Sequence, residues 1–312
     1  MLICGAILGC DLHWRPWRPW LLGLALASAL PVGAALAAAA RITIVDGAAV
    51  VIDGDRRFTA TEGQWLGERA LIETGPAAVL LRIEWPDGSA ADFGPATRAM
   101  VSPGPVSPAL PAPGGPGPAA FYLLQGWAKH SAAAAPPAVG LQTPALRVTL
   151  TQGAVLAFEA AAEGLVFVES GSATATARSA AAASPVALAA GAVYLRTAAG
   201  WQAQGRATPA QLQRVPPGLR TTLPLRAGRF AGKTVAAGAL PPPAYPELQP
   251  WLSAERALRA DFPRRFGTLA ADPAFRKGLV EHLTAHPEWG AVLNPERPRP
   301  PHPPRPALAA SR

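Results

Sequence analysis

Short stretches in which hydrophobic and polar residues alternate dominate the first two thirds of the chain. Between residues 41 and 101, clusters rich in Gly, Asp and Pro separate them. The apolar runs are Arg41–Val45, Ala49–Ile52, Phe58–Ala60, Ala70–Thr74, Val79–Trp85 and Thr97–Val101. Runs this short are typical of β-strands, and Gly and Asp adopt turn conformations that β-branched residues resist. The pattern predicts a compact antiparallel β-module.

The same pattern returns between Phe121 and Thr197. We expect strands at Phe121–Trp127, Ala145–Thr151, Val155–Glu159, Leu165–Glu169, Ala173–Ala177, Val186–Leu188 and Val193–Thr197. Turns are expected at Gln152-Gly153, Glu163-Gly164, Ser170-Gly171, Gly191 and Gly200. Residues 41–48 and 147–154 match in residue type, which suggests that one strand–turn–strand unit is used twice. The sequence therefore predicts a mainly β domain over residues 41–200, as an antiparallel β-sandwich or a short β-solenoid.

Helical spacing appears only near the end of the chain. Residues 201–245 form an irregular, basic segment that we interpret as a linker. Residues 246–293 then place apolar side chains at helix-face spacing, and Asp272-Pro273 is a strong start signal, with an N-cap acid before a proline at the first helical position. This stretch predicts a small unit of two or three helices.

Two segments are too rich in proline to form regular structure. Residues 102–118 contain seven prolines, and because proline lacks a backbone donor we expect a disordered loop inserted between strands. A linker role is favoured over binding to a polyproline-recognising partner. The tail, residues 294–312, combines Pro with Arg and is also predicted to be disordered.

The N-terminal segment, residues 1–37, resembles an export signal. Arg15 and Arg18 precede an uncharged stretch rich in Leu and Ala, and Ala35-Leu36-Ala37 fits a cleavage site. We expect a cleaved signal peptide or an uncleaved anchor, and the positive flank places the rest of the chain in the periplasm in either case. Cys4 and Cys10 both lie in this segment, so stability of the exported part must come from packing.

Charge narrows the expected partners. The net charge is +8, which suits contact with anionic lipid, a cell-wall polymer or an acidic protein. An exported chain is not expected to meet nucleic acid. The inner membrane would be a partner only if the N-terminal segment stays uncleaved.

Motifs with recognisable chemistry are incomplete. Residues 228–234 (GRFAGKT) place three residues between the glycines, where a phosphate-binding loop needs four. His282 and His286 are four residues apart and could face one metal, but Leu283 stands where a zinc protease has its glutamate, and no third ligand is evident. A role in capping or packing is the favoured interpretation for both histidines. We predict no cofactor.

Other polar and aromatic residues have structural interpretations that are favoured over functional ones. Five carboxylates in the first module match no calcium-loop spacing; they are Asp53, Asp55, Glu62, Glu68 and Glu73. Ser170 and Ser172 have no histidine near in sequence to serve as a base. Trp85 and Trp127 are the candidate binding residues, as platforms for a sugar or a protein, although tryptophans at strand ends usually pack in a sheet.

The order of several short motifs resembles the FecR family domain. They are Gly63 to Gly75 (GQWLGERALIETG), Leu80–Ile83, Asp87-Gly88-Ser89, Gly94-Pro95-Ala96-Thr97, Leu124 to Trp127 (LQGW), Gln142-Thr143-Pro144, Val166–Glu169 with Gly171, and Leu188 to Gly191 (LAAG). The resemblance covers about Arg41 to Arg196. Residues 223–295 are similar to C-terminal extensions of such proteins.

This resemblance implies an all-β periplasmic domain without catalytic activity. The best-known members relay a signal from an outer-membrane transporter to a cytoplasmic sigma factor through protein contacts. Those members carry a long cytoplasmic anti-sigma segment before the membrane span, whereas at most eighteen residues precede the apolar run here. The expected type is therefore the exported, stand-alone FecR-domain protein.

Three functions follow in order of preference. The first is a non-enzymatic envelope module for signalling or protein binding, whose partner the sequence does not identify. The second is a cell-wall or polysaccharide-binding module that uses exposed tryptophans. The third is a zinc-dependent hydrolase centred on His282 and His286.

Overall fold

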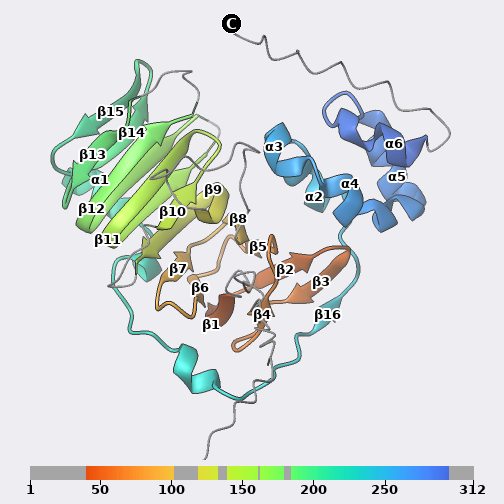
Figure 1. The fold of residues 1–312 in the computed structure, drawn as a ribbon, viewed down its shortest axis with the longest axis horizontal. Helices are drawn as coiled ribbons and strands as arrows, with labels where there is room; N and C mark the ends of the chain where they lie inside the picture. Colours follow the sequence, from red (N-terminus) through yellow and green to blue (C-terminus); the bar gives the residue numbers. More distant parts are fainter. Residues whose placement is uncertain (1–39, 102–118, 133–138, 161, 179–183, 295–312) are drawn as a thin grey trace, which may run out of the picture. The chain divides into compact units, whose positions relative to one another are not determined.

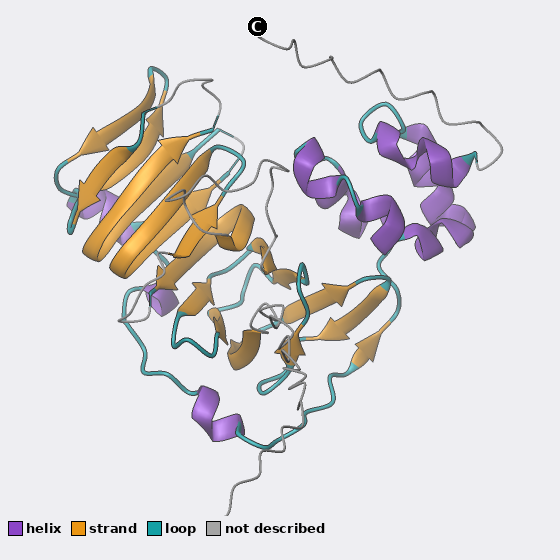
Figure 2. Cartoon of the chain, in the orientation of Figure 1, coloured by secondary structure: helices purple, strands orange, loops and turns teal. Residues whose placement is uncertain are grey.

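The computed structural model describes residues 40–101, 119–132, 139–160, 162–178 and 184–294 (Figure 1). The predicted signal segment, the Pro-rich insertion and the tail from residue 295 lie outside the described residues. Strands dominate the chain, and short helices follow them near its end (Figure 2). The prediction of a mainly β domain followed by a small helical unit is confirmed. No helix in the described part is both long and apolar enough to cross a bilayer.

The strands pair almost entirely in antiparallel fashion. They are β1 (Ala40–Asp46), β2 (Ala49–Asp53), β3 (Arg56–Thr59), β4 (Trp65–Leu66), β5 (Leu71–Thr74), β6 (Leu80–Glu84), β7 (Ala90–Phe93), β8 (Arg98–Val101), β9 (Ala119–Ser131), β10 (Val139–Gln142), β11 (Leu146–Glu159), β12 (Gly164–Ala177), β13 (Val186–Ala189), β14 (Val193–Thr197), β15 (Gly200–Gln204) and β16 (Ala239–Leu240). Among the described pairings only β9 and β10 are parallel.

The pairings define two layers that share three long strands. One layer has the order β16-β3-β2-β5-β8-β9-β10-β11-β12-β13, and the other has β4-β1-β6-β7-β9-β11-β12-β14-β15. Their inner faces enclose one core, in which Phe121 of the first layer meets Phe93 of the second with ring centres 5.3 Å apart. This arrangement is an antiparallel sandwich in which β9, β11 and β12 pass from one layer into the other.

A bulge marks the crossing point of each shared strand. Gly126, Gly153 and Gly171 lie there, with φ of +94°, +92° and +74°, beside shifts in pairing register. Side chains on a strand alternate between its two faces, and one extra residue shifts this alternation by one position. Odd-numbered residues therefore face the core on one side of the bulge and even-numbered residues on the other. The core residues change from Leu123 to Ala128 in β9, from Leu150 to Val155 in β11, and from Val168 to Ala173 in β12.

The turns predicted at Gln152-Gly153 and Ser170-Gly171 are therefore wrong. Gly153 and Gly171 pair with one another across β11 and β12 and bend these strands without reversing them. The proposed repeat fails for the same reason, because Gly47 follows the end of β1 whereas its counterpart Gly153 lies within β11. The sequence analysis also predicted no strand at β4, β7, β10, β15 or β16.

Replacing Gly171 by alanine should destabilise the sandwich. An added Cβ would lie 2.0 Å from the Gln152 carbonyl oxygen, so a backbone clash adds to the left-handed strain. We expect the free energy of unfolding to fall by at least about 2 kcal/mol in urea denaturation. Gly191→Ala is the matched control, since φ is +85° there and nothing lies within 4 Å of the added carbon. Equal losses in the two variants would show that the close contact is unimportant.

The helical unit covers the outer face of the first layer. It comprises α2 (Tyr245–Leu252), α3 (Arg256–Arg259), α4 (Phe262–Arg265), a 3₁₀ turn (Gly267–Ala271), α5 (Pro273–Glu281), a second 3₁₀ turn (Pro287–Trp289) and α6 (Gly290–Leu293). It is divided into more and shorter pieces than the two or three helices expected. The predicted start of α5 is confirmed, because the Asp272 carboxylate accepts from Phe275 N at 2.7 Å.

A continuous apolar cluster joins this unit to the sheet. Trp251, Phe262 and Phe266 are fully buried with Met100 of β8 and Tyr122 of β9. Polar contacts add to it: Arg178 at the end of β12 binds the Glu255 carboxylate through both terminal nitrogens, at 2.8 and 2.5 Å. The unit is therefore packed on the sandwich as a lid over one face.

The segment between β15 and β16, residues 205–238, contacts strands of the second layer at several points, and we call it the strap (cyan in Figure 1). It contains helix α1 (Pro209–Gln213) and two 3₁₀ turns (Pro217–Leu219 and Ala227–Phe230). Val215 and Leu219 are buried against Trp127, Leu156 and Val193 of the sheet. The segment predicted as a basic linker is thus packed on the sandwich along much of its length.

Buried charges under the strap hold it in place. Arg82, Asp92 and Lys129 are direct cross-strand neighbours on β6, β7 and β9, and each is at most 2% exposed. Lys129 Nζ lies 2.6 Å from a Glu169 carboxylate oxygen and donates to Thr222 of the strap at 3.1 Å. Glu84, two positions after Arg82 on β6, is also buried. Its carboxylate accepts hydrogen bonds from the backbone N–H groups of Arg226 and Ala227 in the strap.

His130 and Asp92 have opposite effects on the pH dependence of stability. Burial lowers the pKa of His130 from 6.5 to about 4, so stability that depends on the neutral ring is lost as the pH falls from 6.5 toward 4. Burial raises the pKa of Asp92 from 3.8 to about 6, although Arg82 and Lys129 lower it in part. Folding then favours the protonated acid, and stability is gained as the pH falls from 6 toward 3.8.

Removing either group should therefore expose the effect of the other. As the pH falls from about 6 to 3.8, the free energy of unfolding of Asp92→Asn should decrease by about 2 to 3 kcal/mol relative to that of the wild type. As the pH falls from 6.5 to about 4, the free energy of unfolding of His130→Gln should increase by a similar amount relative to that of the wild type. Urea denaturation at a series of pH values measures both. Parallel profiles for the three proteins would contradict the assignment.

Candidate functional site: a groove at the bend of strand β9

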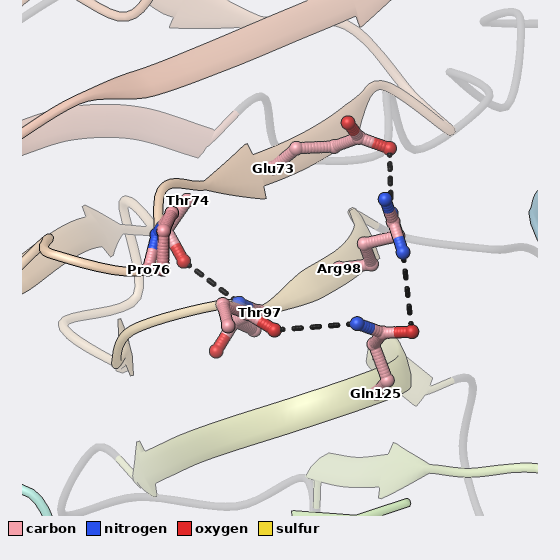
Figure 3. Close-up of a pocket in the computed structure, with 7 residues that line it drawn as sticks. Glu73, Thr74, Pro76, Thr97, Arg98 and Gln125 are labelled. Carbon is pink, nitrogen blue, oxygen red and sulfur yellow. Dashed lines mark hydrogen bonds and ion pairs between the residues drawn. The ribbon is translucent and has the colours of Figure 1, made fainter. Parts of the chain in front are cut away.

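The bend of β9 opens a groove on the surface of the sandwich. Its cavity of about 480 Å³ is lined by Pro76, Pro95, Ala96, Gln125, Gly126, Trp127, Phe158, Glu159 and Ala160. A smaller cavity of about 160 Å³ shares Pro76, Ala96 and Gln125 with it and adds Glu73, Thr74, Thr97 and Arg98 (Figure 3). We call the two together the β9 groove. Its volume lies in the range of ligand-binding clefts.

Two threonines fix the backbone beneath the groove. The Thr74 hydroxyl accepts from Thr97 N at 2.9 Å and donates to Gly94 O at 2.6 Å (Figure 3). The Thr97 hydroxyl in turn accepts from Trp127 N at 3.0 Å. Gly126 is required here, because a Cβ would lie 2.5 Å from the Thr97 hydroxyl oxygen. The Gly-Pro-Ala-Thr and Gln-Gly-Trp motifs of the sequence therefore meet at this bend.

A chain of polar contacts forms one wall. The Arg98 guanidinium donates to Glu73 at 3.2 Å and to the Gln125 amide oxygen at 3.2 Å (Figure 3). The same Glu73 oxygen accepts from the indole N–H of Trp251 at 3.1 Å. This wall is thus linked directly to helix α2, so the groove and the helical unit share a hydrogen-bond network.

The opposite wall is aromatic. The ring centres of Trp127 and Phe158 lie 4.7 Å apart, and the two ring planes are inclined at 33°. The strap supports them from behind, since Leu219 is buried in the same cluster, and the Arg214 guanidinium lies 5.6 Å from the Phe158 ring. An apolar wall facing a few fixed polar groups suits recognition of an extended segment.

Glu159 lies where β11 ends, beside the groove. Val155 and Ala157 of the same strand face the core, and Glu159 is the next residue in this alternating series. Its carboxylate accepts a hydrogen bond from Arg196 at 3.2 Å. Burial raises the pKa of the Glu159 carboxyl, and Thr143 and the Arg196 charge lower it by less. This carboxyl therefore holds its proton to a higher pH than an exposed glutamate.

The two candidate tryptophans are both buried, at 7% exposed for Trp85 and 9% for Trp127. Trp85 packs edge-on against His130 in the core, with ring centres 6.1 Å apart. Trp127 lines the groove and packs against Phe158. Neither presents an open indole face, as a sugar platform would require.

The candidate metal ligands pack against one tyrosine. The ring centre of Tyr245 lies 5.4 Å from His282 and 6.0 Å from His286. His282 Nδ1 lies 3.0 Å from the carbonyl of Gly278, and burial lowers the pKa of His286. Within the described residues, no three His, Cys, Asp or Glu side chains are grouped as a metal site requires.

The remaining motifs are placed in ordinary structural contacts. The first three residues of the GRFAGKT segment belong to the 3₁₀ turn Ala227–Phe230. Glu84 binds the N–H groups of Arg226 and Ala227 just before the segment. The acidic residues of the first module do not converge, since Asp55 accepts from Thr268 and Glu73 pairs with Arg98. The Ser170 hydroxyl accepts from Ala154 N at the β11–β12 bulge.

Sequence reasoning missed most of the groove. Pro76, Arg98, Gln125 and Phe158 come from four separate segments, and nothing in their local spacing links them. The only signal was the pair of Gly-containing motifs that meet beneath it.

Comparisons with known proteins give limited similarity. No protein-family model matches the chain, and no curated protein matches it. Among the solved structures that match are two crystal structures, at 2.50 and 1.65 Å resolution, both described as "a putative anti-sigma factor from Parabacteroides distasonis ATCC 8503". Identity is 11% and 10%, the TM-score is 0.34 for both, and each match covers 44% of this chain. This chain spans 59% of the length of those proteins. The fold is accordingly assigned from the strand pairings of this chain alone.

Proposed function

We propose that this chain is a non-enzymatic FecR-domain protein of the cell envelope that acts by binding another protein. The β9 groove is the docking site for an extended segment of that partner. The observation that carries the proposal is the convergence of the family-like motifs beneath the groove, where Thr74, Thr97 and Gly126 hold its floor. Residues that fix the backbone of an open groove support recognition by that groove.

The lining residues fit this role better than a catalytic one. The described lining contains aromatic, proline and amide side chains. Its charged groups are paired, Glu73 with Arg98 and Glu159 with Arg196, and the hydroxyls of Thr74 and Thr97 are engaged by the backbone. Such groups orient a peptide, and none of them is a nucleophile with an adjacent base. The second candidate, sugar binding through Trp85 and Trp127, gains no support because both rings are buried.

Site-specific photocrosslinking tests the proposal. A photoreactive side chain at Ala160, on the groove rim, should yield one dominant adduct with an envelope protein in cells. The same group at the exposed residue Ala285, in the helical unit, should not. Gln125→Trp fills the groove and should reduce the adduct at least about tenfold, which corresponds to the loss of one good contact.

The matched control is Gln202→Trp, which adds the same bulk on the exposed face of β15. It should leave the adduct unchanged. An adduct at Ala160 that survives Gln125→Trp, or equal adducts at Ala160 and Ala285, would contradict docking in the groove.

A further inference from the structure

We infer that a second surface, centred on Trp65 of β4, binds an acidic segment of a partner protein. This Trp65 surface comprises Trp65 with Arg226, Arg229 and Lys233 of the strap. The inference adds a contact site to the proposed function and does not depend on the β9 groove, because it rests on different residues.

Trp65 is an exposed indole that is held rigidly. It is 51% exposed, and the Arg41 guanidinium lies 3.8 Å from the centre of its ring. Arg41 is itself fixed, since it donates to the Phe230 carbonyl at 2.7 Å and is buried. One ring face is therefore occupied and the orientation is set before binding. Rigid Trp side chains of this kind are the usual energetic centres of protein interfaces.

The strap brings its cations to this tryptophan. The turn before β4 packs on the strap so closely that a Cβ on Gly63 would lie 2.7 Å from Val235 and 2.9 Å from Phe230. Arg229 precedes Phe230 directly, and Lys233 N donates to the same Phe230 carbonyl at 3.0 Å. Both side chains are exposed. They lie in the GRFAGKT segment, to which the proposed function assigns no role.

The local charge favours an acidic peptide. Arg226 lies 3.9 Å from the Glu62 carboxylate, and the buried Glu84 carboxylate binds the backbone at Arg226 and Ala227. The net positive charge of this surface therefore comes from the exposed Arg229 and Lys233. A surface that binds anionic lipid headgroups usually clusters four to eight cations, and a carboxylate among them would weaken it. A short acidic segment needs only a few charge pairs with one apolar anchor, and Trp65 provides that anchor.

Binding of a labelled peptide of alternating Glu and Ala to the full chain tests this inference. Fluorescence anisotropy should detect binding that weakens as the salt concentration rises, because exposed charges are screened. The corresponding Gln–Ala peptide should bind at least about tenfold more weakly. Trp65→Ala and the double variant Arg229→Gln/Lys233→Gln should each weaken binding of the acidic peptide about tenfold.

Two controls separate a site from general attraction. Arg206→Gln/Arg256→Gln removes the same charge from exposed positions elsewhere and should change affinity less than about twofold. Val280→Ala removes another exposed apolar side chain and should have no effect. Thermal melting should show that all variants stay folded, as expected for exposed positions.

Several results would overturn the inference. They are equal binding of the two peptides, equal losses in the two double variants, or unchanged binding in Trp65→Ala. Retention on anionic vesicles or peptidoglycan without binding of the acidic peptide would also overturn it. The β9-groove adduct tests the other site: a groove adduct without peptide binding removes this inference alone, and peptide binding without a groove adduct removes the proposed docking site alone.

Discussion

Replacing Trp251 by alanine should lower the free energy of unfolding by about 3 to 5 kcal/mol. The side chain is fully buried between α2 and the sheet. Truncation would leave a cavity in the apolar cluster that joins the helical unit to the sheet, and it would remove the indole donor to Glu73. Chemical denaturation followed by far-UV circular dichroism measures the loss.

Trp65→Ala is the matched control for this prediction, since it removes the same side chain from an exposed site. We expect it to cost less than about 1 kcal/mol. Trp251→Phe keeps most of the ring and loses the hydrogen bond, so its cost should be about 1 to 2 kcal/mol. If Trp251→Ala cost no more than Trp65→Ala, the helical unit would not be packed on the sheet as described.

Replacing Glu84 by alanine should cost a similar amount, about 3 to 5 kcal/mol, because it leaves a buried guanidinium without one of its partners. Arg82 Nε lies 3.3 Å from the Glu84 carboxylate, and both side chains are almost fully buried. The strap would also lose its acceptor for the N–H groups of Arg226 and Ala227. Limited trypsin digestion should therefore cut at Arg226 or Arg229 much sooner than in the wild type.

Glu62→Ala provides the comparison. Glu62 also faces Arg226 of the strap, but at 3.9 Å and with its side chain 39% exposed. Glu62→Ala should lower the free energy of unfolding by less than about 1 kcal/mol, because exposed ion pairs contribute little to stability. The rate of trypsin digestion should stay unchanged. Similar behaviour of the two variants would mean that the buried carboxylate does not hold the strap.

Most strands of the first module could be predicted because they are short apolar runs between turn residues. The 14-residue strands β11 and β12 were each predicted as two shorter strands. β7 escaped prediction because its sequence, Ala-Ala-Asp-Phe, contains a carboxylate that is buried only in the folded chain, next to Arg82. The glycines at the bulges are predicted as turns because glycine is common both in chain-reversing turns and in β-bulges. What decides between them at Gly153 is its partner, Gly171, on the next strand. No local rule supplies that information.

Function was less predictable than fold, for a related reason. Residue type alone indicates Trp85 and Trp127 as binding residues, but the register of the folded sheet buries both. Trp65, by contrast, is exposed. The sequence predicts a linker here because the anchors of the strap, Glu84 and Lys129, lie far away in sequence, and only tertiary pairing brings them under it.

The three strands that belong to both layers limit how this molecule can respond to a ligand. Sandwiches whose halves meet only through side chains can slide or separate, but here the backbone itself joins the halves three times. Separating them would require the rupture of whole strands. Any change of shape that accompanies recognition must then arise in the coverings of the sandwich, where the helical unit and the strap are held by side chains.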